Sequence, residues 1–179
     1  AEGLYAHDGN PITALMAEEG IRALAAALPV LVKAPQDTEA RAQALYGAWL
    51  CGTVLGQVAM GLHHKLCHTL GGSFNLPHAE VHTVVLPHAL AYNAAAAPQA
   101  MQRIARALGR DDGKAAQAVF DLAKANGAPV ALRDIGVQAG DLDKACDIAL
   151  QNQYPNPRPL EARAIRELLQ AAWEGARPG

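Results

Sequence analysis

The chain has 179 residues, of which 51% are hydrophobic and 4% aromatic, and its formal net charge is −2 at pH 7. This length suits one domain with a sizeable core, and the abundance of alanine over β-branched and aromatic residues favours helix over strand. Positive and negative residues are mixed along the chain without a basic cluster, which excludes the charge pattern typical of nucleic-acid-binding proteins.

The three cysteines (Cys51, Cys67 and Cys146) are odd in number, far apart and without a CxxC pair. That usage is typical of a reduced, cytoplasmic protein and not of a disulfide scaffold. No basic region followed by an apolar run opens the chain, so we expect no signal peptide. The uncharged stretch 42–64 contains glutamines, glycines and a histidine pair, and therefore predicts a buried helix rather than a membrane span.

The first predicted helix runs from about Pro11 to Leu28. Asn10 is a favourable N-cap residue, and a proline in the first helical turn loses no hydrogen bond. Apolar residues recur at helical spacing along this range. Pro29 and Pro35 are expected to end or bend the helix, because proline has no N–H to donate.

A second and a third helix follow in the sequence. Asp37 or Thr38 is expected to cap the second helix, which continues past Trp49. The third helix is expected over about residues 61–70. The pair Gly71-Gly72 is expected to stop it, since glycine is common just after a helix end.

The rest of the chain also predicts helix. After a loop over Ser73–Pro77, a helix spans about His78 to Asn93, with Pro87 inside it as an expected kink or break. The later predicted helices are Pro98 to about Gly109, Asp111 or Asp112 to Asn126-Gly127, Asp141 to Gln151, and Leu160 to about Gly175, with the turn-rich segment Tyr154–Pro159 before the last. No strand pattern is present, so residues 1–179 are predicted to form one all-α bundle of about seven to nine helices.

Six of the seven histidines lie in one stretch, Met60 to Asn93. On a helix, His64 and His68 are at positions i and i+4 and project from one face. The loop after that helix returns the chain to His78, so three imidazoles can converge on one point. Three nitrogen ligands with an open position would suit a catalytic divalent metal, and one of the three could instead handle protons.

The other histidines give weaker indications. His63 is turned about 100° from its helix neighbour, so a structural and a functional role are equally open for it. His82 lies four residues after His78 and can face the same cavity, although a structural role is more common for such a residue. His7 and His88 are expected to be polar caps or satisfied interior groups.

A spaced motif runs through the histidine stretch. Its residues are Gly61, His64, His68, Gly71, Pro77-His78, Leu86-Pro87-His88 and Tyr92-Asn93, and Asn156-Pro-Arg158 follows late in the chain. This pattern resembles the C-terminal helical domain of the iron-containing (group III) alcohol dehydrogenase family. That family has G-x-x-H-x-x-x-H-x-x-G, then P-H, then L-P-H, a terminal Y-N or F-N, and a late N-P-R turn.

Within that family the chain is most similar to the maleylacetate reductase branch, in which Ala79 and Glu80 follow His78 where other members have glycine. The resemblance implies a two-domain enzyme whose N-terminal nucleotide-binding α/β domain lies outside this chain, with NADH or NADPH as cofactor. It implies reduction of 2-maleylacetate to 3-oxoadipate in the degradation of aromatic compounds. The residues Ala1–Tyr5 read like the tail of a helix, so we expect a piece of a longer protein.

The resemblance also assigns roles to residues. His64 and His78 match metal-ligand positions of the family, which implies Fe²⁺ or Zn²⁺ as one alternative. His68 matches the histidine beside the nicotinamide, a candidate for proton transfer. The maleylacetate reductase branch is often altered at the upstream ligand positions. Without a metal, His64 and His78 could bind a substrate carboxylate or stabilise charge directly.

The substrate of that branch is a dianion, so cationic groups are expected near it. Lys65 and protonated His63 or His82 are the local candidates for binding the dicarboxylate. The resemblance implies a homodimer, with the N-terminal domain as a second partner, and neither nucleic acid nor a membrane is expected. Two other functions stay open: a metal-dependent alcohol or aldehyde dehydrogenase of the same family, and a non-enzymatic helical metal-binding module.

Overall fold

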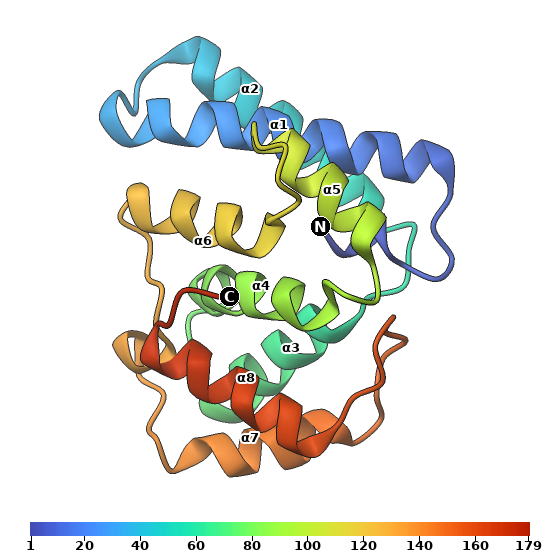
Figure 1. Cartoon of the computed structure of the whole chain (residues 1–179). Helices are drawn as coiled ribbons and strands as arrows, with labels where there is room; N and C mark the ends of the chain where they lie inside the picture. Colours follow the sequence, from blue (N-terminus) through green and yellow to red (C-terminus); the bar gives the residue numbers. More distant parts are fainter.

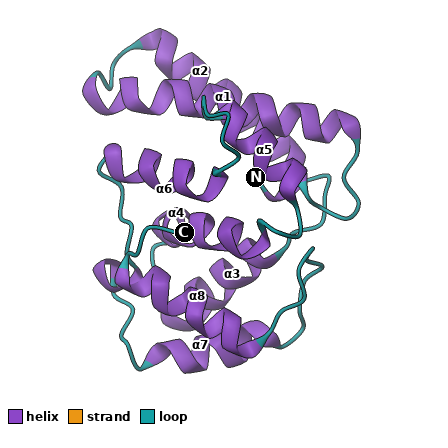
Figure 2. Cartoon of the chain, viewed as in Figure 1, coloured by secondary structure: helices purple, strands orange, loops and turns teal.

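The computed structural model describes all 179 residues and consists of eight α-helices and two short 3-10 helices joined by loops (Figure 2). It has no strand, which confirms the predicted all-α fold. The helices are α1 (Pro11–Lys33), α2 (Thr38–Leu55), α3 (Leu62–Phe74), α4 (His78–Asn93), α5 (Pro98–Ala107), α6 (Ala115–Ala125), α7 (Asp141–Leu150) and α8 (Ala162–Glu174), with the 3-10 helices η1 (Glu2–Leu4) and η2 (Leu132–Ile135). None of them combines the length and the apolar character that crossing a membrane requires.

The helices stack from one end of the molecule to the other (Figure 1). α1 and α2 form a hairpin at one end, α4 runs through the middle against α3, α6 and α8, and α7 lies with α8 at the other end. The main core lies between α3, α4, α7 and α8, where Leu66, Val81, Leu142 and Leu169 are fully buried. This core sets the relative position of α3 and α4, the two helices that carry the clustered histidines.

The predicted start of α1 is confirmed. The Asn10 side chain accepts hydrogen bonds from the amides of Ile12 (2.9 Å) and Thr13 (3.0 Å), and the Thr13 hydroxyl accepts one from the Asn10 amide. This capping box satisfies amides that have no partner inside the helix. Asp37 caps α2 by accepting from the amide of Ala40 at 2.9 Å.

The predicted end of α1 near Leu28 is wrong, because the helix continues through Pro29 to Lys33. A proline inside a helix removes one backbone hydrogen bond. α1 packs extensively against α2, and this tertiary contact offsets the loss. Pro35 lies in the short turn between the two helices.

α1 and α2 approach each other closely at Gly20 and Gly47. A Cβ atom on Gly47 would lie 2.9 Å from Leu24 Cγ and 3.0 Å from the carbonyl oxygen of Gly20, which is tighter than real Cβ contacts allow. Gly52, on the outer side of α2, has no atom within 4 Å of the same position. Gly47 is therefore needed for packing, whereas Gly52 leaves open space on the surface.

Gly47→Ala is expected to lower the free energy of unfolding by about 1–3 kcal/mol, because the added methyl forces the two helix backbones apart. Gly52→Ala is the matched control. It should leave stability unchanged or raise it by up to about 1 kcal/mol, since glycine inside a helix costs conformational entropy. Urea unfolding followed by circular dichroism measures both variants, and equal effects would contradict the close crossing.

Gly71-Gly72 do not stop α3, contrary to the prediction. The helix runs on to Phe74 and ends at Asn75, whose φ of 50° is left-handed. Neither glycine has a positive φ, and Phe74 packs against the main core, so burial of the aromatic ring outweighs the cost of glycine in the helix. The loop predicted over Ser73–Pro77 shortens to residues 75–77.

The boundaries of α4 match the prediction, and Pro87 lies inside the helix without ending it. α6 begins at Ala115 rather than at Asp111 or Asp112, which corrects the predicted start. Asp112 instead pairs with the Arg110 guanidinium at 2.6 Å and holds the turn before the helix. α5, α7 and α8 begin and end within two residues of the predicted positions.

Candidate active site

Five of the clustered histidines gather where α3 meets α4. α3 supplies His63, His64 and His68, and α4 supplies His78 and His82. The ring centroids of His64 and His68 lie 6.0 Å apart, as expected for positions one helical turn apart. The other neighbouring rings lie 4.3–5.1 Å apart, so the five imidazoles form one continuous group, which we call the histidine group.

His82 links the two helices of the histidine group. Its ring centroid lies 5.1 Å from that of His64 and 4.3 Å from that of His78. It also lies 4.8 Å from the His63 ring. His78 therefore joins the α3 histidines, as predicted, but the ring of His82 lies next to both and connects them.

Glu2, on η1, is a site residue that the sequence reasoning missed. Its carboxylate lies 2.5 Å from Nδ1 of His64 and accepts hydrogen bonds from the amides of His63 (2.8 Å) and Gly61 (3.2 Å). Burial raises the pKa of this carboxyl, but the hydrogen bond to His64 and the nearby imidazoles outweigh burial and lower it to about 2. Because an ionised carboxylate can only accept, the His64 proton lies on Nδ1, which leaves Nε2 as the atom that can meet a ligand.

Tyr154 is a second site residue that the sequence reasoning did not single out. It lies in the turn-rich segment before α8, and its hydroxyl lies 3.1 Å from Nδ1 of His68. This contact orients the exposed His68 ring, and a hydroxyl that donates to Nδ1 places the His68 proton on Nε2. The Lys65 Nζ lies 5.5 Å from the centroid of the Tyr154 ring, within cation–π range.

Burial favours the neutral forms of the inner histidines. Desolvation is the largest cause that lowers the pKa of His63 to about 3 and that of His82 to about 4, and it outweighs the attraction of Glu2. Desolvation also lowers the pKa of His68, to a smaller extent. The protonated forms expected for His63 and His82 are therefore disfavoured, which leaves Lys65 as the cation among the predicted substrate-binding residues.

The donor atoms of the histidine group suit a divalent transition metal. The ring nitrogens of His63, His64 and His82 lie within 4.8 Å of one another, and Nε2 of His82 is buried without a hydrogen-bond partner. The contact of Glu2 with Nδ1 of His64 is the carboxylate–histidine arrangement typical of metal ligands. The predicted ligands were His64 and His78; in the structure the His82 ring neighbours both, with centroids 5.1 Å from His64 and 4.3 Å from His78.

A cavity of about 230 Å³ lies beside His63 and His64. Its lining is mostly apolar, and the ionisable side chains in it are those of Glu2, Cys51, His63 and His64, with no lysine or arginine among them. A site of this character does not suit a dianion, because a buried carboxylate needs opposite charge or hydrogen-bond donors. The more open side of the histidine group, where Lys65 and His68 lie, suits a dianion better.

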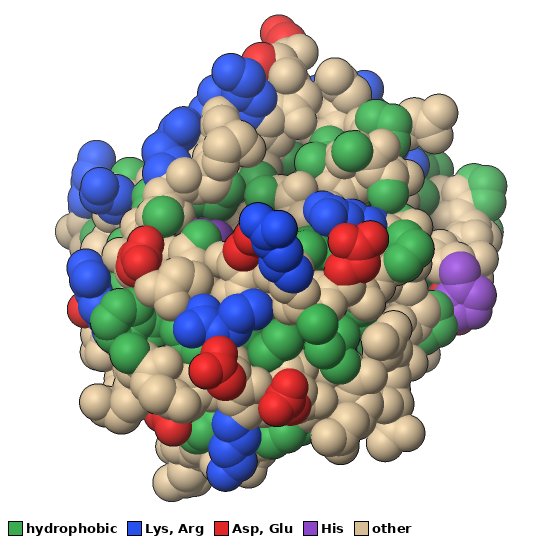
Figure 3. All heavy atoms as spheres, turned by 60° about the horizontal axis from the view of Figure 1, so that its bottom comes forward, with side chains coloured by type: hydrophobic (Ala, Val, Ile, Leu, Met, Phe, Trp, Pro, Cys, Tyr) green, Lys and Arg blue, Asp and Glu red, His purple; other side chains and the backbone are tan.

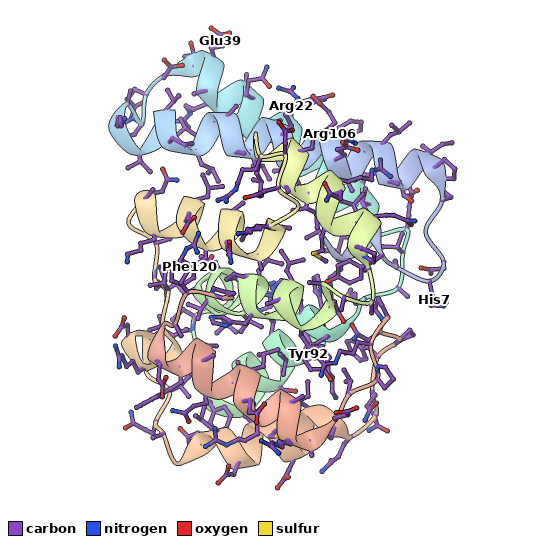
Figure 4. The ribbon with its side chains drawn as sticks, viewed as in Figure 1. His7, Arg22, Glu39, Tyr92, Arg106 and Phe120 are labelled. Carbon is purple, nitrogen blue, oxygen red and sulfur yellow. The ribbon has the colours of Figure 1, made fainter.

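The two remaining histidines lie outside the histidine group. His7 is exposed on the loop before α1, at the edge of the molecule (Figure 4). His88 is 4% exposed inside α4, and its Nε2 has no hydrogen-bond partner. The prediction of an interior group is confirmed for His88, but the prediction that its hydrogen bonds are satisfied is wrong. Desolvation lowers the pKa of His88 to about 4.

His88 is expected to make the protein less stable in mild acid. The unfolded chain protonates this ring below about pH 6.5, whereas the folded protein does so only near pH 4, so stability present above pH 6.5 is lost over that window. His88→Asn should reduce the fall in unfolding free energy across the window by up to about 3 kcal/mol. Urea unfolding at several pH values measures this, with His7→Asn as the exposed control, and an unchanged pH dependence would contradict the depressed pKa.

Charged side chains of both signs share the surface. On one face Lys and Arg side chains lie among Asp and Glu side chains (Figure 3). Ion pairs in the molecule include Asp121 with Arg177 at 2.7 Å and Asp143 with Arg166 at 2.5 Å. Oppositely charged side chains of the molecule are therefore partly paired with one another.

Comparison with protein families relates the whole fold to known proteins. The family described as "Fe-containing alcohol dehydrogenase family, C-terminal" matches residues 1–173. The chain is 64% identical over 178 residues to a maleylacetate reductase of Burkholderia cepacia, covering 99% of this chain and 50% of that protein. It is 62% identical over 177 residues to a maleylacetate reductase of Pseudomonas sp. strain P51, with the same coverage.

Solved structures give the same result. A putative alcohol dehydrogenase from Ralstonia eutropha JMP134 superposes with a TM-score of 0.98 at 68% identity, over 99% of this chain and 50% of that one. A maleylacetate reductase from Agrobacterium tumefaciens superposes with a TM-score of 0.95 at 57% identity, with the same coverage. The chain thus spans about half the length of the curated relatives it matches.

Proposed function

Since this chain belongs to the iron-containing alcohol dehydrogenase family, we propose that it is the C-terminal half of an NAD(P)H-dependent reductase that converts 2-maleylacetate to 3-oxoadipate in the degradation of aromatic compounds. The observation that carries this proposal is the 64% identity, over 99% of the chain, to a protein named maleylacetate reductase. The nucleotide-binding half is proposed to be an N-terminal α/β domain. Three free cysteines support a cytoplasmic location.

His64 is assigned to charge stabilisation. The substrate has a C=C bond conjugated to a ketone, and the bound nicotinamide supplies a hydride to that double bond. Negative charge then builds on the ketone oxygen, where a preorganised donor lowers the barrier. In its protonated form His64 presents Nε2–H to this oxygen, while Glu2 holds the ring through Nδ1 and balances its charge.

His68 is assigned to proton delivery onto the carbon next to the ketone. Its ring lies one helical turn from His64, at 6.0 Å between centroids, and is exposed. Tyr154 holds Nδ1 of His68 at 3.1 Å, so that Nε2 carries the proton to be delivered. Lys65 and the exposed His78 are assigned to the substrate carboxylates, since both lie on the more open side of the histidine group.

A metal-dependent alcohol or aldehyde dehydrogenase of the same family is the second candidate. The ring nitrogens of His63, His64 and His82, which lie within 4.8 Å of one another, favour it. His64 and His78, with His82 between them, would hold Fe²⁺ or Zn²⁺, and the bound ion would supply a Lewis acid for a carbonyl oxygen. The names of the relatives argue against the non-enzymatic metal-binding module.

Turnover of 2-maleylacetate by the full-length parent protein tests the proposal. Oxidation of NADH and of NADPH is followed before and after metal removal by a chelator. We expect turnover that survives chelation. Turnover that is lost and then restored by iron or zinc would favour a metal on His64 and His78. No turnover in either state would reject the reductase and favour the alcohol dehydrogenase.

We propose that the nucleotide-binding half packs against the outer side of α2. The large hydrophobic side chains that are exposed all lie on α1 and α2, and Leu45 (72% exposed) and Trp49 (63%) are among the most exposed. No charged residue interrupts the stretch 42–64. This surface continues through Gly52 and Leu55 into the cavity beside the histidine group. A domain seated there would close the cavity and bring a nicotinamide to the histidines.

Leu45→Glu in the full-length parent is expected to raise KM for NADH about tenfold or more, because a charge would be buried against the second domain. Val32→Glu, on the last turn of α1, is the control and should behave like the wild type. Sedimentation velocity of the same proteins checks the homodimer that the resemblance implies. A change from dimer to monomer at unchanged KM would assign the α2 surface to a second copy of the chain.

A further inference from the structure

The first four amides of α3 are satisfied by side chains remote in sequence. Such amides have no partner inside a helix, and no neighbouring side chain caps this one. Glu2 accepts from three of the four amides at 61–64, and Asn156 accepts from the fourth, that of Leu62, at 3.3 Å. A Cβ on Gly61 would lie 2.8 Å from the Glu2 carboxylate and 3.4 Å from the Asn156 oxygen, so only glycine fits between the two acceptors.

Asn156 is itself held by Asn93, the last residue of α4. Asn93 Nδ2 donates to Asn156 Oδ1 at 2.9 Å, and Asn156 Nδ2 donates to Asn93 Oδ1 at 2.7 Å. Asn156 Nδ2 also donates to the carbonyl oxygen of Arg158 at 2.7 Å. Asn93 is fully buried, so the two amides satisfy each other and have little freedom to rotate. We call this reciprocal pair the asparagine clasp.

The asparagine clasp joins the start of α3, the end of α4 and the segment before α8. α3 and α4 carry the whole histidine group. The segment is anchored further by Tyr92, labelled in Figure 4, whose hydroxyl donates to the Pro159 carbonyl oxygen at 2.7 Å and whose ring lies 4.1 Å from the Arg158 guanidinium. The clasp therefore ties the first turn of α3 to a rigid point outside that helix.

We propose that Asn156 is a positioning residue: through the asparagine clasp it fixes the first turn of α3, so that the His64 ring stays on Glu2 and presents Nε2 to the substrate. The catalytic part of this inference rests on the proposed function. A displacement of a catalytic group by about 1 Å can lower the rate by on the order of 100-fold. We therefore expect that disrupting the asparagine clasp lowers kcat.

The experiment compares Asn156→Asp and Asn156→Ala in the full-length parent with Gln151→Ala, an exposed residue at the end of α7. Aspartate keeps the shape and the acceptor for the Leu62 amide but cannot donate to Asn93. We expect kcat for 2-maleylacetate to fall about tenfold or more in both Asn156 variants, with KM for NADH unchanged. Gln151→Ala should match the wild type. Thermal unfolding of each variant is measured first. If Asn156→Ala does not fold, the isosteric Asn156→Asp variant alone carries the test.

Histidine NMR separates positioning from a general loss of structure. In ¹⁵N-histidine-labelled protein, we expect the Nδ1 proton that His64 shares with Glu2 to give a strongly downfield signal. We expect the signal to shift or broaden in the Asn156 variants, well below their unfolding temperatures, and to stay unchanged in Gln151→Ala. An unchanged signal together with kcat within about twofold of wild type would overturn the proposal. If the wild type does not reduce 2-maleylacetate, the proposed function fails, and the NMR comparison, which needs no substrate, still decides on the clasp.

Discussion

His68→Asn in the full-length parent is expected to lower kcat for 2-maleylacetate reduction by about 100- to 10,000-fold, the loss typical of removing a general acid. Asparagine keeps a polar group at this position but delivers no proton near neutral pH. KM for NADH should change little, because the substitution removes no group assigned to the nucleotide. Steady-state rates followed by NADH absorbance give both constants.

The His68 substitution has a matched control in the same chain. His68 is exposed, so its replacement is not expected to unfold the protein. His7→Asn makes the same chemical change at an exposed histidine outside the histidine group (Figure 4) and should leave kcat unchanged. A kcat like that of the wild type in His68→Asn would reject proton delivery by this residue.

Glu2→Gln is expected to lower the free energy of unfolding by about 3 kcal/mol at neutral pH, because it removes one partner of a buried charged contact. Glu2 is 6% exposed, and its carboxylate accepts from the amides of Gly61 and His63 as well as contacting His64. Glutamine keeps the shape, but its NH₂ group would face amide donors. The His64 ring also loses its orientation, so turnover should fall with stability.

Glu2 also predicts how stability responds to strong acid. Its pKa of about 2 in the folded protein lies below the ordinary value of 4.5, so the unfolded chain takes up this proton first as the pH falls. The stabilisation is complete above about pH 4.5 and is lost between about pH 4.5 and 2. The stability difference between wild type and Glu2→Gln should therefore shrink over that window.

Urea unfolding across the acid range measures this difference. Glu80→Gln, an exposed carboxylate on α4, is the control and is expected to change stability by less than about 0.5 kcal/mol. A stability difference between wild type and Glu2→Gln that stayed constant down to the lowest pH at which both proteins fold would show that the Glu2 carboxylate is not paired as the structure has it.

The two helix ends that were predicted wrongly from the sequence lie where tertiary packing outweighs a local preference against helix. Pro29 and Gly71-Gly72 are poor helix residues; Pro29 was expected to end or bend its helix, and the glycine pair to end the next one but one. α1 continues because it packs against α2, and α3 continues because Phe74 reaches the main core. Neither packing contact is visible in the residues next to the breaker, so the sequence could not weigh the two effects.

By itself the sequence determined the helical class, most helix starts and the shared face of two catalytic candidates. Asn10 and Asp37 cap their helices as predicted, and His64 and His68 lie one turn apart. These features depend on residues within about one helical turn of each other, which a reader of the chain can see. The motif around the histidines also led to the correct family.

Only the tertiary structure decided which groups hold the histidines in place. Glu2 meets His64 across 62 residues of sequence and Tyr154 meets His68 across 86. The Asn156 cap on α3 spans 94 residues. No periodicity relates residues on different elements, and their distances follow from how α3, α4 and the segment before α8 pack around the shared core. The clustering of the histidines could therefore be predicted from the chain, whereas the orientation of their rings depends on burial and on long-range hydrogen bonds.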